Sequence, residues 1–323
     1  MAWPSSSPAW DIISEKMYGA YYQLLAYNTN LFNEATRGGL VLSAGQIEGD
    51  FSTMSFFNRL SGLVRDRDIT SDASVSSIDF SMDNISRVKY AKGTPPVRLD
   101  RHRWEWILKN PEDAVALISQ QLVEETIAAQ LALAAGALIA ANTGVGATLT
   151  YDGTAGTTSL AGLTNAAQLF GDRSGDINCW LMHSKCYTDL QLAALANANH
   201  LFQIGSVRVV QDAAGRPIVV SDLPTLVYTS TGTKYHVLGL TPGAAVVEAE
   251  QDFFFNVDTR NGNENIGATW QAQWTENIGL KGFTYDTTNG GRNPTQATLL
   301  TSTNWDKKAT SVKDCGAVLA NFQ

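Results

Sequence analysis

Cysteine and histidine are scarce in this chain of 323 residues, which contains three cysteines and four histidines. Three thiols cannot all pair within one chain. Because 44% of the residues are hydrophobic, the chain can bury a core without disulfides, and we expect free thiols in a reducing compartment. Any catalytic site built on the histidines has to be assembled by the fold, since they stand far apart in the sequence: His102, His183, His200 and His236.

Basic clusters, a leader and a membrane span are also lacking. The net charge is −8, and no group of lysines and arginines indicates the phosphate binding of a nucleic-acid reader. Residues 1–8 have neither the positive nor the apolar part of a secretory signal, so we expect the protein to be made and used in the cytosol. The most apolar window, residues 126–141, is too short for a span and contains Gln130, which favours a soluble helix.

Aromatic residues are dense at the start of the chain, where residues 1–37 carry seven of them. An end this apolar should dock either on its own domain or on a neighbouring subunit. The spacing of apolar residues in residues 51–64 predicts a short amphipathic helix. Residues 75–90 alternate around Asp83 and Asn84, which predicts two strands joined by a turn. The seven aromatic residues are Trp3, Trp10, Tyr18, Tyr21, Tyr22, Tyr27 and Phe32.

The clearest element is a long helix that starts at residue 111. Asn110 is a good N-cap, Pro111 suits the first helical position, and two acidic residues follow. Gly144 predicts the end of the helix, which gives a length of about 45 to 50 Å at 1.5 Å per residue. The first half is amphipathic and the second half, residues 127–141, is apolar almost all round. We therefore expect one end to be half exposed and the other closely packed.

The remaining sequence predicts an α+β region followed by one very long strand. Residues 143–175 are rich in glycine, threonine and alanine, with a short helix near residues 163–170. A buried strand at 177–182, a helix at 184–197 and several short strands up to residue 257 follow. Residues 266–285 alternate in polarity with a change of phase at Gly282, which predicts a strand of about 65 Å with a bulge. A compact globule rarely needs such a strand.

The best candidate for chemistry is the group Cys179, His183 and Cys186. It resembles part of a zinc site, for which Cys315 or His200 is a possible fourth ligand. It also allows a Cys-His nucleophile pair with Asp189 as the orienting residue, although nothing nearby indicates a lowered thiol pKa. The simpler interpretation is small buried thiols. We therefore predict no catalytic, metal or cofactor-binding residues, and a structural protein rather than an enzyme.

Several short motifs resemble a subgroup of tailed-bacteriophage major capsid proteins with the Hong Kong 97-type fold. The resemblance covers residues 35 to 323, and the order of the elements agrees with it. The motifs are EGDF at 48–51, VRDR at 64–67, GTPP at 93–96, NPE at 110–112, WLMHS at 180–184, NGNEN at 261–265 and LTSTNWD at 300–306.

The resemblance implies an N-terminal arm and an extended loop hairpin, a peripheral domain with a long spine helix, and an axial domain. The corresponding segments are 1–45 for the arm, 46–105 for the extended loop, 106–175 for the peripheral domain, 176–265 for the axial domain, and 266–323 for the return strand and C-terminal segment. It further implies hexamers and pentamers that tile an icosahedral head around double-stranded DNA, assembled in the host bacterial cytoplasm. Expected partners are other copies of the chain, a separate scaffold protein, a portal at one vertex and a possible decoration protein, with no membrane and no sequence-specific contact with the packaged DNA.

Extended elements bury little within their own subunit, so their apolar residues need neighbours, and such interfaces are large. Charges that flank the extended loop are candidate contacts between subunits, although ordinary solvated charges explain each of them equally well. Two alternatives remain open: an encapsulin-like compartment shell with the same fold, and a thiol or zinc enzyme. The candidate contact residues are Arg65, Arg67, Asp68, Asp100, Arg101 and Arg103.

Overall fold

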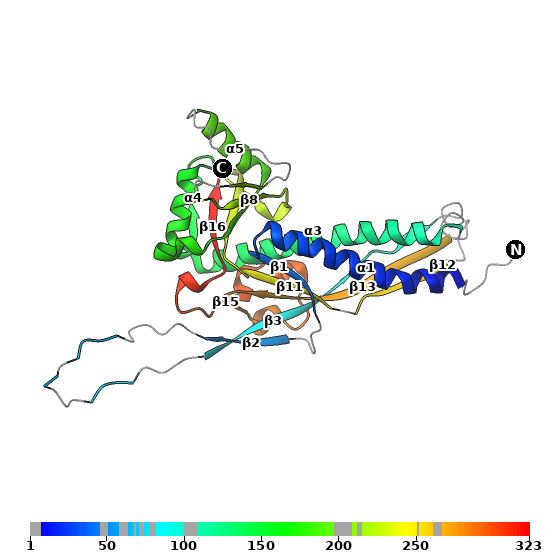
Figure 1. Cartoon of the computed structure of the whole chain (residues 1–323), viewed down its shortest axis with the longest axis horizontal. Helices are drawn as coiled ribbons and strands as arrows, with labels where there is room; N and C mark the ends of the chain where they lie inside the picture. Colours follow the sequence, from blue (N-terminus) through cyan, green and yellow to red (C-terminus); the bar gives the residue numbers. More distant parts are fainter. Residues whose placement is uncertain are drawn as a thin grey trace.

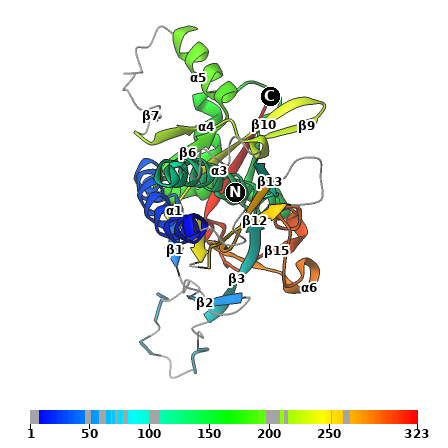
Figure 2. The ribbon, with the colours of Figure 1, turned by 90° about the vertical axis from the view of Figure 1, so that its right-hand side faces the viewer.

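A computed structural model gives the arrangement of the chain, which is elongated rather than round (Figure 1). Two long helices lie at one end, a lobe of short helices and strands stands beside the middle, and a hairpin projects at the opposite end. Figure 2, an end-on view, shows the two long helices side by side. The structure describes residues 8–45, 51–57, 64–67, 69–70, 74–77, 82–99, 109–196, 209–211, 215–250, 252–260 and 267–323.

Residues 8–35 of the aromatic start of the chain form a long helix, α1 (Pro8–Ala35). Met17, Tyr21 and Leu25 lie on one face of α1 at a spacing of four residues and are buried. They pack against α3 (Pro111–Val145) and β12 (Phe254–Arg260), and the ring of Tyr21 stacks on Phe253 at 4.3 Å. For these residues, the docking surface is the chain's own domain.

The predicted long helix is confirmed as α3, which is 35 residues long. The backbone carbonyl of Asn110 accepts the first helical hydrogen bond, from Ala114. The helix ends at Val145 and is capped by Gly146, which has a φ of 80° and lies two residues beyond the predicted stop at Gly144. One stretch of the described residues, Glu112–Thr148, is apolar enough to cross a membrane by composition, but 67% of its most apolar window is buried inside the molecule, as in a core helix.

Sheet A carries the two long helices on one face. Its order is β1 (Leu40–Gly45), β11 (Ala245–Glu250), β13 (Gly267–Leu280), β3 (Met82–Gly93) and β2 (Phe51–Phe57), with β4 (Val97–Leu99) and β12 also paired to β13. Residues at even positions of β13, such as Ala272, Ile278 and Leu280, are buried, which confirms the predicted alternation. These buried side chains face the helices, because successive side chains of a strand point to opposite faces of the sheet.

Sheet B forms the lobe beside the middle of the molecule. Its order is β5 (Thr150–Asp152), β16 (Ala317–Phe322), β10 (Gly232–Leu240), β6 (Cys179–Met182), β8 (Pro217–Val220) and β7 (Val209–Gln211), with β9 (Val227–Ser230) on β10. The described residues also contain four shorter helices: α4 (Leu160–Ala167), α5 (Ser184–Ala196), α6 (Thr287–Gly290) and α7 (Gln296–Leu299). The strands of each sheet come from several of the segments expected from the resemblance, such as the extended loop and the axial domain. The boundaries of these segments stay a prediction.

Three expectations from the sequence are wrong. The predicted helix at 51–64 begins as the strand β2, and residues 58–63 lie outside the described residues. The predicted turn at Asp83 and Asn84 lies inside the continuous strand β3, which pairs with β2 from Val88 to Met82. The return strand stops at Leu280. Gly282, with a φ of 83°, turns the chain into the separate strand β14 (Phe283–Tyr285), which pairs with β15 (Trp305–Lys307).

Candidate assembly interface

Three of the predicted contact residues, Arg65, Arg67 and Asp68, belong to the segment that joins β2 to β3, and the other three follow β4 in the sequence. Arg65 and Arg67 are exposed. The other four, Asp68, Asp100, Arg101 and Arg103, lie outside the described residues. The structure therefore places two of the six candidates at the surface of the projecting hairpin.

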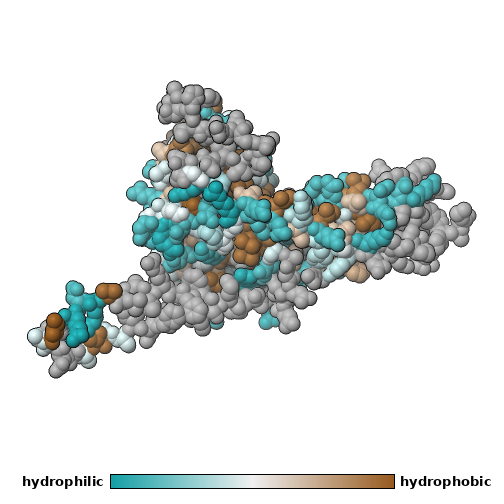
Figure 3. All heavy atoms as spheres, viewed as in Figure 1, coloured by the Kyte–Doolittle hydropathy of each residue, from teal (hydrophilic) through white to brown (hydrophobic). Residues whose placement is uncertain are grey.

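Three apolar side chains of the same segment are exposed. Val64 is 94% exposed, Ile69 86% and Val75 55%. Figure 3 shows apolar atoms among polar ones at the far end of the hairpin. Sequence reasoning missed them as contacts, because isolated apolar residues among charges give no periodic pattern. These exposed apolar side chains are candidates for a contact with another molecule.

A groove runs between the first half of α3 and sheet A. Its volume is about 530 Å³, and Trp270, Trp274, Ile118 and Leu122 form its apolar part. Glu125 and Gln121 line its helical side. Residues Pro111–Val145 contain four acidic residues and no lysine or arginine, and of the four acidic residues Glu125 lines the groove, which also has Lys92 of β3 in its lining. That absence of basic residues was visible in the sequence and is the signal that would have found this surface.

A buried carboxylate ties α3 to the sheet beneath the groove. Glu276 of β13 is 1% exposed. One of its oxygens accepts hydrogen bonds from Gln130 Nε2 and Trp274 Nε1, both at 2.9 Å, and the other accepts one from the Tyr90 hydroxyl. Burial, and then the charge of Glu276, raises the pKa of Tyr90 well above its usual value, so Tyr90 stays a donor. The glutamine that interrupts the apolar part of α3 is thus a partner of this carboxylate.

The three thiols are buried and free. Burial raises the pKa of Cys179 to about 12 and those of Cys186 and Cys315 to about 11. Nucleophilic cysteines need the opposite shift, because the thiolate is the reactive form. Asp189 pairs with Lys185, and His183 lies 3.5 Å from Asp222, so the geometry does not support the proposed orienting role of Asp189.

The zinc hypothesis finds no support in the described residues. Within them, no three His, Cys, Asp or Glu side chains gather closely enough to hold a metal ion. His200, a possible fourth ligand, lies outside the described residues. The simpler interpretation of Cys179 and Cys186, as small core side chains, agrees with their complete burial.

His236 on β10 is expected to make stability depend on pH. Its Nδ1 lies 2.7 Å from Asn321 Oδ1, and its ring stacks on Tyr228 at 4.2 Å. Burial lowers its pKa below the usual value, more than the contact with Asn321 raises it. The unfolded chain therefore takes up this proton first, so the free energy of unfolding falls as the pH drops below about 6.5. Urea denaturation between pH 7.5 and 5.5 measures this loss, and His236→Gln should reduce it; an equal loss in the variant contradicts the assignment.

Comparison with known proteins shows the family to which the chain belongs. A family profile described as Major capsid protein 13-like matches residues 10–319. The chain belongs to this family. A search of the curated proteins found no match. The groove and the hairpin are therefore features of a capsid subunit, a protein that assembles with further copies of itself.

Solved structures give the fold of this capsid protein. The capsid asymmetric unit of cyanophage Pam1 is similar with a TM-score of 0.54 and 12% identity, covering 85% of each chain. A structure from Microbacterium phage Oxtober96 has a TM-score of 0.50 and 13% identity, covering 87% of this chain and 89% of the other. The holo-SrpI encapsulin complex from Synechococcus elongatus has a TM-score of 0.48 and 13% identity, covering 87% and 84%, too low a score to argue from. The Hong Kong 97-type α+β fold predicted from the sequence is confirmed.

Proposed function

We propose that this capsid protein assembles as hexamers and pentamers into the icosahedral head of a tailed bacteriophage, around double-stranded DNA. The observation that carries the proposal is the family match over residues 10–319, supported by an elongated fold that leaves apolar side chains uncovered. The net charge of −8 agrees with a capsid interior that encloses DNA without binding it tightly. The protein then resides in the virion after assembly in the host bacterial cytoplasm.

The hairpin is proposed to reach over a neighbouring copy. Figure 1 shows it at the opposite end of the molecule from the start of α3, so it cannot meet the groove of its own copy. The hairpin offers apolar Val64 and Ile69 beside basic Arg65 and Arg67. The groove offers an apolar floor with acidic Glu125 on its helical side and Lys92 on its sheet side. A contact between two different surfaces repeats from copy to copy and closes into a ring when the rotation allows it.

The charges around the hairpin are proposed to pair between copies. The proposal covers all six predicted residues, of which Arg65 and Arg67 are exposed. Exposed ion pairs contribute about 0 to 1 kcal/mol each, so single substitutions such as Arg65→Gln should lower assembly yield modestly and more at low salt. If no single substitution among the six changes the yield of assembled particles, these charges are solvated and not contacts.

Other partners follow from the same proposal. Assembly should involve a separate scaffold protein, a portal at one vertex and possible decoration proteins. Electron microscopy of the protein, alone and expressed with its neighbouring genes, tests the function. Icosahedral particles, sheets or tubes support it. A monodisperse small oligomer contradicts it, and closed shells that contain a cargo enzyme and no DNA indicate an encapsulin-like compartment instead.

A further inference from the structure

Among the described residues, the hairpin is joined to the rest of sheet A by the pairing of β3 with β13. Over residues 88–93, β3 pairs with β13, and over residues 82–88 it pairs with β2. The two pairings meet at Val88 and do not overlap. From Arg87 back to Met82, β3 pairs with β2 and no longer with β13, so the direction of the hairpin depends on the contacts that these residues make with the rest of the chain.

Arg87 makes the most far-reaching of these contacts. Its guanidinium crosses β13 and donates to Glu248 on β11, with 2.9 Å between Nη1 and Oε1. Both side chains are mostly buried, at 16% and 23% exposure, where an ion pair is worth more than at the open surface. The crossing is possible because residue 279 is glycine: a Cβ there would lie 2.6 Å from Arg87 Cγ. Arg87 therefore connects the root of the hairpin to β11, a strand with which β3 does not pair.

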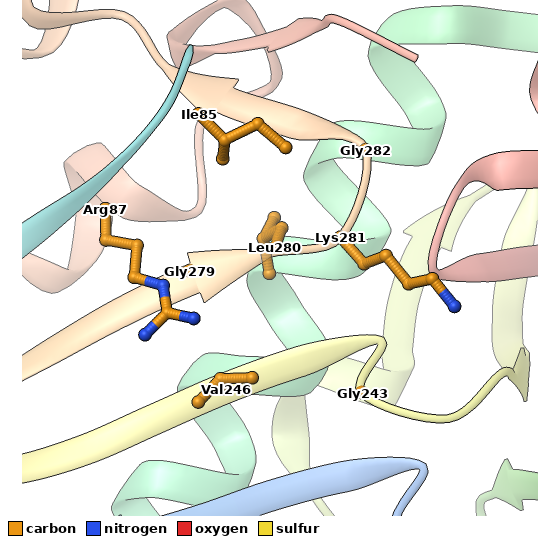
Figure 4. A pocket seen from close by; sticks show the side chains of 8 residues that line it. All are labelled: Ile85, Arg87, Gly243, Val246, Gly279, Leu280, Lys281 and Gly282. Carbon is orange, nitrogen blue, oxygen red and sulfur yellow. The ribbon is translucent and has the colours of Figure 1, made fainter. Parts of the chain in front are cut away.

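A cavity lies next to this contact. It has a volume of about 210 Å³, with apolar walls from Ile85, Val246 and Leu280. Figure 4 shows Ile85 and Arg87 of β3 facing the turn that follows β13, where Gly279 and Gly282 leave the space open. Ser86, whose N–H donates to Thr284 Oγ1 at 2.9 Å, gives a second polar contact with the rest of the chain. The root of the hairpin is thus held by the contact of Arg87 with Glu248 and lies next to a cavity.

We propose that this root is the joint at which the hairpin changes direction, and that the contact of Arg87 with Glu248 across Gly279 is the positioning element that holds it. The consequence rests on the proposed function: a chain that occupies rings of five and rings of six meets its neighbours at two angles. A tilt at Arg87 supplies that difference while sheet A stays unchanged.

The chain contains a matched control for Arg87. Lys89, two residues further into sheet A, forms an ion pair with Glu250. Lys89 lies opposite Asn277, where β3 is already held by its pairing with β13. Removing this second charge should weaken the sheet in the same way but leave the direction of the hairpin unchanged.

Pulsed electron paramagnetic resonance on the unassembled full chain tests the joint. One spin label goes on the hairpin at Ser76→Cys and the other on the body at Ala297→Cys, both exposed positions. The native cysteines are buried and have raised pKa values, so they react slowly with the label. The distribution of label-to-label distances should broaden and shift in Arg87→Gln but not in Lys89→Gln. Arg87→Lys should restore part of the original distribution, and Gly279→Ala should resemble Arg87→Gln.

Two outcomes overturn the proposal: an unchanged distribution in Arg87→Gln, or an equal broadening in Arg87→Gln and Lys89→Gln. Should Arg87→Gln not fold, Glu248→Gln and the exchange Arg87→Glu with Glu248→Arg make the same comparison. Restoration by the exchange supports the pair as the positioning contact. Because no assembly is needed, failure here is distinct from failure of the capsid function, which microscopy tests.

Discussion

Replacing Glu276 with alanine is expected to lower the free energy of unfolding by about 3 to 5 kcal/mol. The substitution leaves three buried donors without their acceptor: the Tyr90 hydroxyl, Gln130 Nε2 and Trp274 Nε1. A buried donor that loses its partner costs about 1 to 3 kcal/mol. These donors belong to β3, α3 and β13, so the loss falls where the long helix meets the sheet. Urea denaturation of the unassembled chain measures it.

Two further variants show whether the loss comes from the hydrogen bonds of Glu276. Glu276→Gln removes the charge but keeps an acceptor, and Glu124→Ala removes a carboxylate elsewhere. In Glu276→Gln, the amide oxygen still accepts from Gln130 and Trp274, so the expected loss is smaller, about 1 to 2 kcal/mol. Glu124→Ala removes an exposed carboxylate from α3 and should change stability by no more than about 0.5 kcal/mol. A loss in Glu276→Ala no larger than in Glu124→Ala would show that the network does not hold the helix to the sheet.

The sequence predicted the elements whose signal is local. The N-terminal signals at Asn110 and Pro111 belong to one turn of helix, so α3 and its amphipathic first half could be found without the rest of the chain. The alternation along β13 is likewise visible in the strand alone, since it records which side of the sheet is covered. The short buried strand β6 and the helix that begins at Ser184 follow the same rule.

The errors occurred where distant residues decide the structure. Residues 51–64 carry apolar side chains at spacings compatible with a helix, but residues 51–57 form a strand because β3 lies beside them. At Gly282, the sequence showed a change of phase, yet only the pairing of β14 with β15 decides between a bulge and a turn. The arrangement of Glu276 with Gln130 joins residues 146 positions apart. No local pattern contains that information.

Replacing Ile69 with aspartate is expected to lower the yield of assembled particles by at least about tenfold while leaving the subunit folded. Ile69 is 86% exposed in the isolated chain, so its substitution should change the free energy of unfolding by no more than about 0.5 kcal/mol. In the proposed contact it is buried by a neighbour, where an isoleucine contributes about 1.5 to 3 kcal/mol. A change of about 1.4 kcal/mol in the free energy of association changes the association constant about tenfold. Every copy in a ring loses the contribution of its own isoleucine.

Sedimentation and electron microscopy of particles, with urea denaturation of the subunit in parallel, separate assembly from folding. Ser76→Asp serves as the matched control, because it places the same charge at an exposed polar position of the same hairpin. Ile69→Val keeps an apolar side chain and should assemble nearly as well as the original sequence. If Ile69→Asp forms particles as readily as Ser76→Asp, no neighbour covers the exposed apolar residues of the hairpin, and the groove beside α3 needs another occupant. If only Ile69→Asp fails, its partner can be located by an acidic-to-neutral exchange at Glu125, which should alter yield only when Arg65 and Arg67 are present.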